Sequence, residues 1–126
     1  MDIKTASIFV EDQSKALAFY TDILNFQKVS DIAVGEFRWL TVSAGGSGGA
    51  ELLLEPNAHP AAKAYQAAIY ADGIPATLFH SADIQEEYRQ LTAKGVSFTS
   101  KPMENGGVWV AIFDDGCGNW IQLVQE

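Results

Sequence analysis

The chain has 126 residues, of which 48% are hydrophobic and 19% are charged, and its net charge at pH 7 is −8. This length corresponds to one domain, and the apolar content predicts a packed core rather than a disordered chain. The negative charge repels phosphates, and the eight Lys and Arg residues are scattered rather than grouped. We therefore expect no nucleic-acid partner.

The N-terminal sequence and the cysteine content indicate the compartment. No basic stretch followed by an apolar run opens the chain, and no apolar segment approaches the length of a membrane span. The single cysteine, Cys117, cannot form an internal disulfide, which suits a reducing environment. These features predict a cytoplasmic protein without a membrane partner.

We expect residues 3–55 to form a strand, a helix and three further strands. Asp12 follows the first strand and can cap a helix that ends near Leu24. The apolar residues of this segment have the spacing of one buried helical stripe; they are Ala16, Phe19, Tyr20, Ile23 and Leu24. Residues 57–73 predict another helix, with Pro60 in its first turn. It has no counterpart elsewhere in the chain, so we interpret it as a connector.

Residues 75–125 repeat the plan of residues 3–55. The strand at 77–80, which corresponds to residues 7–10, precedes a helix that starts at Asp83 and stops at Gly95. Two similar half-domains that face each other enclose a shared cleft, so repeated positions become candidate site positions.

Strand parity selects the residues that face this cleft, because alternate side chains of a strand point to opposite faces. If the first helix covers Ile8 and Val10, then Thr5, Ser7 and Phe9 face the cleft. The same alternation along all strands predicts a ligand-binding surface of Thr5, Ser7, Phe9, Trp39, Glu51, Leu53, Thr77, Phe79, Trp109, Trp120 and Gln122. This surface is aromatic with a few polar groups, as small-molecule sites usually are.

Several other features are interpreted as structural. The glycine-rich run 45–49 lacks the Gly-Lys-Ser/Thr ending of a phosphate loop, so we expect a flexible hairpin loop. Cys117 lies in a turn cluster without a histidine nearby in sequence, which favours a turn residue over a reactive thiol. His59 and His80 lack the spacing of a zinc pair. We place His59 at the start of the connecting helix and treat His80 as structural or partly exposed.

Several short motifs in a fixed order carry a family resemblance. They are Phe9-Val10-Glu11-Asp12, Ala18-Phe19-Tyr20 with Leu24-Asn25-Phe26, Glu51-Leu52, Lys94-Gly95-Val96, and Phe113-Asp114-Asp115 with Gly118-Asn119-Trp120-Ile121-Gln122-Leu123. Together they resemble the vicinal oxygen chelate superfamily of glyoxalase I, extradiol dioxygenases, fosfomycin-resistance thiol transferases and bleomycin-resistance proteins.

The resemblance implies an α+β fold for the single domain 1–126. Two βαβββ modules, at 3–55 and 75–125 with the connector helix 57–73 between them, would form a curled mixed sheet around a cleft. Members of the superfamily are commonly dimers, so we expect a homodimer.

Metal-using members of the superfamily place four ligands on four strands of the cleft, typically His or Gln, Glu, His and Glu. By position these ligands correspond to Thr5, Glu51, Thr77 and Gln122. Glu51 suits a metal, Gln122 is a weaker neutral ligand, and threonine hydroxyls are poor ligands for a divalent transition metal. We therefore expect no metal and no other cofactor, with a weakly bound divalent metal as the open alternative.

The sequence favours a metal-free, small-molecule-binding member of the superfamily, with an organic ligand held in an aromatic cleft around Glu51. The ligand would present a cationic or hydrogen-bond-donating group to this carboxylate. In an alternative interpretation, Glu51 is held in a satisfied polar network with Thr5, Thr77 and Gln122.

Two other functions stay open, and with them the question whether the chain is an enzyme. With Glu51 as a catalytic general base, it would be a lyase, isomerase or dioxygenase acting on a small oxygenated substrate. As an interaction module, it would dock a partner protein through the alanine-rich helix at 60–70.

Overall fold

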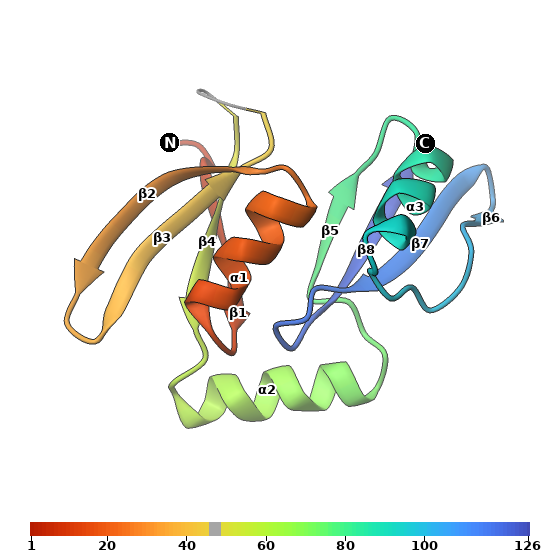
Figure 1. Ribbon diagram of the computed structural model, residues 1–126. Helices are drawn as coiled ribbons and strands as arrows, with labels where there is room; N and C mark the ends of the chain where they lie inside the picture. Colours follow the sequence, from red (N-terminus) through yellow and green to blue (C-terminus); the bar gives the residue numbers. More distant parts are fainter. Residues whose placement is uncertain (46–48) are drawn as a thin grey trace. The chain divides into compact units, whose positions relative to one another are not determined.

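The computed structural model describes residues 1–45 and 49–126, so the predicted glycine-rich hairpin loop falls largely outside the described residues. The chain runs βαβββ, then one helix, then βαβββ again (Figure 1). The first set of elements is β1 Thr5–Val10, α1 Gln13–Ala18, a π-helical turn Phe19–Ile23, β2 Gln27–Val34, β3 Phe37–Ser43 and β4 Glu51–Pro56. After α2 Pro60–Ala71 come β5 Thr77–His80, α3 Ile84–Ala93, β6 Met103–Asn105, β7 Val108–Asp114 and β8 Trp120–Gln125.

Two four-stranded sheets repeat one topology. We call the sheet of order β1-β4-β3-β2 sheet A and the sheet of order β5-β8-β7-β6 sheet B. In each sheet the first and last strands of the module pair in parallel, and the remaining neighbours are antiparallel. The predicted α+β class with two βαβββ modules is confirmed.

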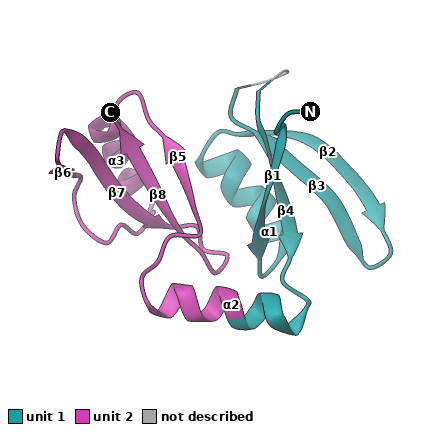
Figure 2. Cartoon of the chain, turned by 180° about the vertical axis from the view of Figure 1, so that it is seen from behind, with its two compact units in different colours: residues 1–64 teal, residues 65–126 magenta. Residues whose placement is uncertain are grey.

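The chain divides into two compact units, Met1–Ala64 and Tyr65–Glu126, and the boundary falls inside helix α2 (Figure 2). Pro60 is the first residue of this helix, and the Nδ1 atom of His59 accepts a hydrogen bond from Ala61 N at 3.0 Å. The predicted helix and the place of His59 at its start are confirmed. In the described part of the chain, no helix has the length and apolar character needed to cross a membrane.

Helix starts and stops follow local chemistry. The side chain of Asp12 accepts a hydrogen bond from Lys15 N, and the side chain of Asp83 accepts one from Glu86 N. The predicted cap at Asp12 and the predicted helix start at Asp83 are therefore confirmed. Asn25 ends the first helical segment with φ +61°, and Gly95 ends α3 with φ +90°. Both are in the left-handed conformation that terminates helices.

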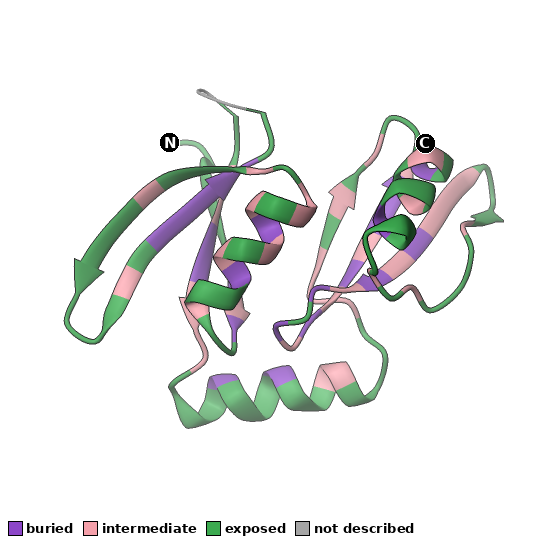
Figure 3. Ribbon diagram, viewed as in Figure 1, coloured by how far each residue is buried: buried purple, intermediate pink, exposed green. Residues whose placement is uncertain are grey.

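Each unit has its core between a helix and one face of a sheet (Figure 3). In unit 1 the buried apolar residues include Ile8, Val10, Ala16, Tyr20, Leu40, Val42 and Leu54. In unit 2 they include Ile84, Leu91, Ala111, Phe113, Ile121 and Leu123. Helix α1 contacts β3 and β4, and α3 contacts β7 and β8. Each sheet therefore has one face toward its helix and one distal face away from it.

Candidate functional site

The distal face of sheet A brings six of the predicted site residues together. Strand register pairs Thr5 with Glu51 and Ser7 with Leu53, and cross-strand partners share a face. Phe9 follows on β1, and Trp39 lies on the same face of β3 because it alternates with the buried helix-side residue Leu40. The parity that we predicted for β1, β3 and β4 is therefore confirmed.

Glu51 is held by a residue that sequence reasoning missed. Its Oε1 atom accepts a hydrogen bond from Thr41 Oγ1 at 2.8 Å, and Thr41 Oγ1 in turn accepts from Ser30 N at 3.1 Å. Thr41 is only 1% exposed, so the hydroxyl is fixed, whereas Glu51 is half-buried. Its second oxygen, Oε2, accepts no hydrogen bond from the described residues. One carboxylate oxygen is thus anchored and the other is available.

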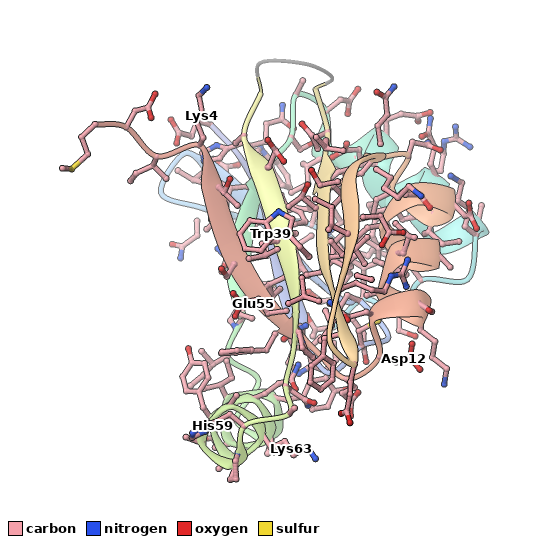
Figure 4. All side chains as sticks on the ribbon, turned by 90° about the vertical axis from the view of Figure 1, so that its left-hand side faces the viewer. Lys4, Asp12, Trp39, Glu55, His59 and Lys63 are labelled. Carbon is pink, nitrogen blue, oxygen red and sulfur yellow. The ribbon has the colours of Figure 1, made fainter. Side chains whose placement is uncertain are left out.

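A second carboxylate lies on the same face. Glu55 is four residues after Glu51 on β4, and its Oε1 atom accepts a hydrogen bond from Ser7 Oγ at 3.3 Å. Figure 4 shows Glu55 and Trp39 on the side of sheet A away from α1, whose start is marked by Asp12. Sequence reasoning missed Glu55, although the two-residue period from Glu51 would have placed it on this face.

The basic residues of the sheet lie on the opposite face. Arg38 donates from Nη2 and Nε to Asp31 at 2.8 and 2.9 Å, and from Nη1 to Ser14 of α1 at 2.9 Å. This pair lowers the pKa of the Asp31 carboxyl to about 2 and raises the pKa of Arg38. Lys28 also contacts Asp31, at 3.5 Å. The distal face of sheet A therefore carries two carboxylates and, among its described strand residues, no base.

The side-chain amide of Gln13 lies between strands β3 and β4. Its Nε2 atom donates to Arg38 O at 2.7 Å and to Leu54 O at 2.9 Å, and its Oε1 atom accepts from Arg38 N at 3.1 Å. In the described residues, the β3–β4 ladder pairs only residues 41–42 with residues 52–53. Gln13 therefore replaces the backbone hydrogen bonds that would continue the ladder.

In unit 2 the predicted parity of β5 was wrong. The register pairs Thr77 with Ile121 and Phe79 with Leu123, two residues that are buried on the helix side of sheet B. Gln122 pairs instead with Leu78. Thr77 and Phe79 therefore do not share a face with Gln122, because a shift of one residue moves every side chain of a strand to the other face.

Trp109 was also predicted on the wrong face of its strand. Trp120 and Gln122 do share the distal face of sheet B, as predicted. Trp109 pairs with Gln125, whose Oε1 atom accepts a hydrogen bond from Ile84 N at the start of α3. Trp109 therefore lies on the helix side of the sheet.

His80 lies on the distal face of sheet B, two residues from Leu78 on β5. In the sequence analysis, His80 was set aside because its side chain and that of Thr77 point to opposite faces of β5. The face of His80 is the one that carries Gln122. Neither the His80 side chain nor the Gln122 side chain has a hydrogen-bond partner among the described residues. Leu78 and His80 therefore replace Thr77 and Phe79 as candidates on β5.

Trp120 is packed by the second half of helix α2. Its ring stacks on Tyr70 with centroids 5.0 Å apart and an interplanar angle of 10°, and its Nε1 atom donates to Tyr70 O at 3.0 Å. Tyr70 in turn donates from its hydroxyl to Asp114 Oδ2 at 2.6 Å. The helix that we interpreted as a connector thus positions a predicted site residue.

Cys117 belongs to a structural turn, as predicted. The carboxylate of Asp115 accepts hydrogen bonds from Cys117 N at 2.7 Å, Asn119 N at 3.1 Å and Asn119 Nδ2 at 2.9 Å. Gln66 of α2 donates to Asn119 Oδ1 and to Cys117 O. The thiol is buried, at 3% exposure, so it has little access to an oxidant or a substrate.

The residues at the superfamily's metal positions do not fit a resident transition metal. Thr5 and Thr77 offer only hydroxyls, and Thr77 lies on the helix side of its sheet. One oxygen of Glu51 is already bonded to Thr41. Across residues 1–45 and 49–126, no three His, Cys, Asp or Glu side chains are grouped so that they could hold a metal ion.

The fold and these motifs define a known superfamily. The model of the Glyoxalase/Bleomycin resistance protein/Dioxygenase superfamily matches residues 2–123, so the chain belongs to this superfamily. It is 56% identical to YurT of Bacillus subtilis (strain 168), and the alignment covers 100% of both chains.

Solved structures share the fold. The chain is similar to UcmS2, with 29% identity, a TM-score of 0.85, and coverage of 98% of this chain and 97% of that one. It is also similar to TnmS3, an antibiotic binding protein from Streptomyces sp. CB03234, with 26% identity, a TM-score of 0.78, and coverage of 99% and 95%.

Proposed function

We propose that the protein binds a small organic ligand on the distal face of sheet A, without a resident metal, and that Glu51 is the central contact. The observation that carries this proposal is the carboxylate of Glu51, which is anchored through Oε1 by Thr41 and has no partner for Oε2 in the described part of the chain. A fixed carboxylate beside an exposed indole suits a cationic or hydrogen-bond-donating group.

Two further observations support this function. Among the described strand residues, this face carries no base that could neutralise Glu51, because Arg38 is paired with Asp31 on the helix side. One structural neighbour, TnmS3, is an antibiotic binding protein with a TM-score of 0.78. We extend ligand binding to this chain as a proposal, together with a homodimeric state, a cytoplasmic location and the absence of a nucleic-acid partner.

The test compares two ligands of nearly the same shape. The planar cation 9-aminoacridine and the neutral ring acridine are titrated at pH 7.5, and tryptophan fluorescence reports binding. We expect the wild-type protein to prefer the cation by about tenfold, which is about 1.4 kcal/mol, and Glu51→Gln to remove that preference. Equal affinity for both compounds in the wild-type protein would reject the central role of Glu51.

Metal analysis is the second arm of the test. Protein purified without chelator and dialysed against Mn, Ni, Zn and Fe(II) should retain no stoichiometric metal. Near-stoichiometric metal that disappears in Glu51→Ala would contradict the metal-free proposal and favour a metal enzyme.

An enzyme remains the second candidate because the free Oε2 atom of Glu51 could accept a proton. A covalently changed ligand, detected by mass spectrometry and absent with Glu51→Gln, would favour it. The interaction-module alternative has less support, because Gln66 and Tyr70 of helix α2 already contact residues of the β7–β8 segment.

A further inference from the structure

The two carboxylates of strand β4 have a defined spacing. Glu51 and Glu55 are four residues apart on one face, and a strand rises about 3.3 Å per residue, so they are about 13 Å apart along the strand. Leu53 lies between them and is only 5% exposed. Two negative ends with an apolar middle therefore lie in one line on the distal face of sheet A.

Each carboxylate is oriented by a hydroxyl group from a neighbouring strand. Thr41 of β3 donates to Glu51 at 2.8 Å, and Ser7 of β1 donates to Glu55 at 3.3 Å. A hydroxyl donor fixes a carboxylate without adding positive charge, so both groups keep their charge for an external partner. Neither carboxylate has a Lys or Arg partner among the described residues.

Aromatic and aliphatic side chains extend this face toward the Glu55 end. The register pairs Ile32 with Trp39 and Val34 with Phe37, so all four side chains share the distal face, and all four are exposed. Trp39 is 47% exposed. Because Thr41 pairs with Leu53 in an antiparallel ladder, Trp39 lies toward Glu55 rather than toward Glu51.

Gln13 separates the strands where Trp39 and Glu55 project. Its amide bonds to Arg38 and Leu54, the neighbours of Trp39 and Glu55 in the chain, in place of a continued β3–β4 ladder. The indole and the carboxylate are therefore not drawn into the close cross-strand contact that a regular ladder imposes. An exposed aromatic face beside an unneutralised carboxylate is a favourable place for an organic cation.

We propose that this face binds an elongated organic dication, in which two amidinium, guanidinium or ammonium groups lie at the ends of a flat apolar body. One cationic group contacts Glu51, the other contacts Glu55 beside Trp39, and the apolar body spans the strand between the two carboxylates. This inference rests on the proposed function and assigns a second binding residue, Glu55, and a class of ligand. Carboxylates so far apart suit two charges on one molecule rather than one metal ion.

The test uses 4′,6-diamidino-2-phenylindole, a rigid bis-amidine, and its mono-amidine analogue 6-amidino-2-phenylindole. Dissociation constants are measured by probe fluorescence for the wild-type protein and for Glu51→Gln, Glu55→Gln and the double variant. Glu104→Gln, on an exposed residue of β6, is the matched control because it makes the same change in net charge. Circular dichroism checks the fold of each variant.

We expect each single substitution to weaken the bis-amidine about tenfold and the double substitution about a hundredfold, because distant sites act additively. The affinity for the mono-amidine should fall with only one of the two single substitutions. Glu104→Gln should leave the affinities for both compounds unchanged. Glu55→Asp, which keeps the charge, should retain most of the affinity.

The inference is overturned if Glu55→Gln leaves the affinity for the bis-amidine unchanged, or if the bis-amidine does not bind. In either case the proposed function still stands if 9-aminoacridine binds in a Glu51-dependent way. If that cation also binds no better than acridine, the proposed function fails as well. The two failures are therefore distinguishable.

Discussion

The amide of Gln13 should contribute measurably to the stability of unit 1, because it bonds to the backbones of two strands. It forms three hydrogen bonds of 2.7 to 3.1 Å, with the backbone N–H and carbonyl groups of Arg38 and with the backbone carbonyl of Leu54. Gln13→Ala removes all three and leaves a backbone N–H and two carbonyl groups of adjacent strands without their partner. Each is part-buried, so water replaces the amide incompletely.

The expected magnitude follows from the number of bonds. An intramolecular hydrogen bond contributes about 1 kcal/mol net, and part-buried groups recover some of this from water, so the loss is about 2–3 kcal/mol. With a denaturant slope of about 2 kcal/mol per molar urea, the unfolding midpoint should fall by about 1 M or more. Alanine is a good helix former, so the substitution adds no helix penalty at the start of α1.

Equilibrium urea unfolding followed by circular dichroism measures this loss. Gln85→Ala is the matched control, because Gln85 is an exposed residue near the start of α3 whose side chain has no hydrogen-bond partner among the described residues. Gln13→Glu is a second variant. It keeps the acceptor for Arg38 N but directs a carboxylate oxygen at two carbonyl oxygens, so it should also destabilise the protein.

The reasoning is refuted if Gln13→Ala and Gln85→Ala unfold at the same urea concentration. That result would mean that β3 and β4 close into a regular ladder without Gln13. It would also remove the argument that Gln13 keeps Trp39 apart from Glu55.

Substitutions at three further positions test local features. Asn25 has φ +61°, so Asn25→Gly should stabilise the protein by about 0.5 kcal/mol and Asn25→Ala should destabilise it by about 1 kcal/mol in urea unfolding. The pKa of Asp31 is lowered from 3.8 to about 2 by Arg38, so its ionised form stabilises the fold above pH 4, and this contribution is lost as the pH falls from about 4 to about 2. Asp31→Asn should therefore flatten the acid-unfolding profile in this range, and an unchanged profile would contradict the pairing. Tyr70→Phe removes the hydroxyl that donates to Asp114 at 2.6 Å and should cost about 1 kcal/mol, while near-UV circular dichroism shows the stack on Trp120 retained.

The elements and the class of fold could be predicted from the sequence because their causes are local. Asp12 and Asp83 cap their helices with their own side chains, and Pro60 is the first residue of α2. Gly95 adopts a left-handed backbone conformation that residues with a side chain adopt only at a cost in free energy. The repeat of these signals is sufficient to predict two modules. The parity of β1 was also predictable, because its buried residues Ile8 and Val10 alternate with the exposed Ser7 and the half-buried Phe9.

The parity of β5 was not predictable in the same way. Thr77–His80 is a four-residue strand, and the sequence alignment that overlaid residues 77–80 on residues 7–10 placed Thr77 and Phe79 on the distal face. Hydrogen bonds to β8 decide the register instead, and they pair Phe79 with Leu123 on the helix side. A short strand carries too few alternating residues to fix its register by itself.

The sequence by itself thus determined the helices, the order of the strands, the superfamily and Glu51 as a site candidate, because caps, turns and periodicity act over a few residues. Tertiary structure alone decided that Thr41 anchors Glu51, that Ser7 of the neighbouring strand donates to Glu55, and that His80 rather than Thr77 shares a face with Gln122. These relations depend on strand pairing between residues far apart in the chain. A register shift of one residue reverses them, and no local signal in the sequence sets that register.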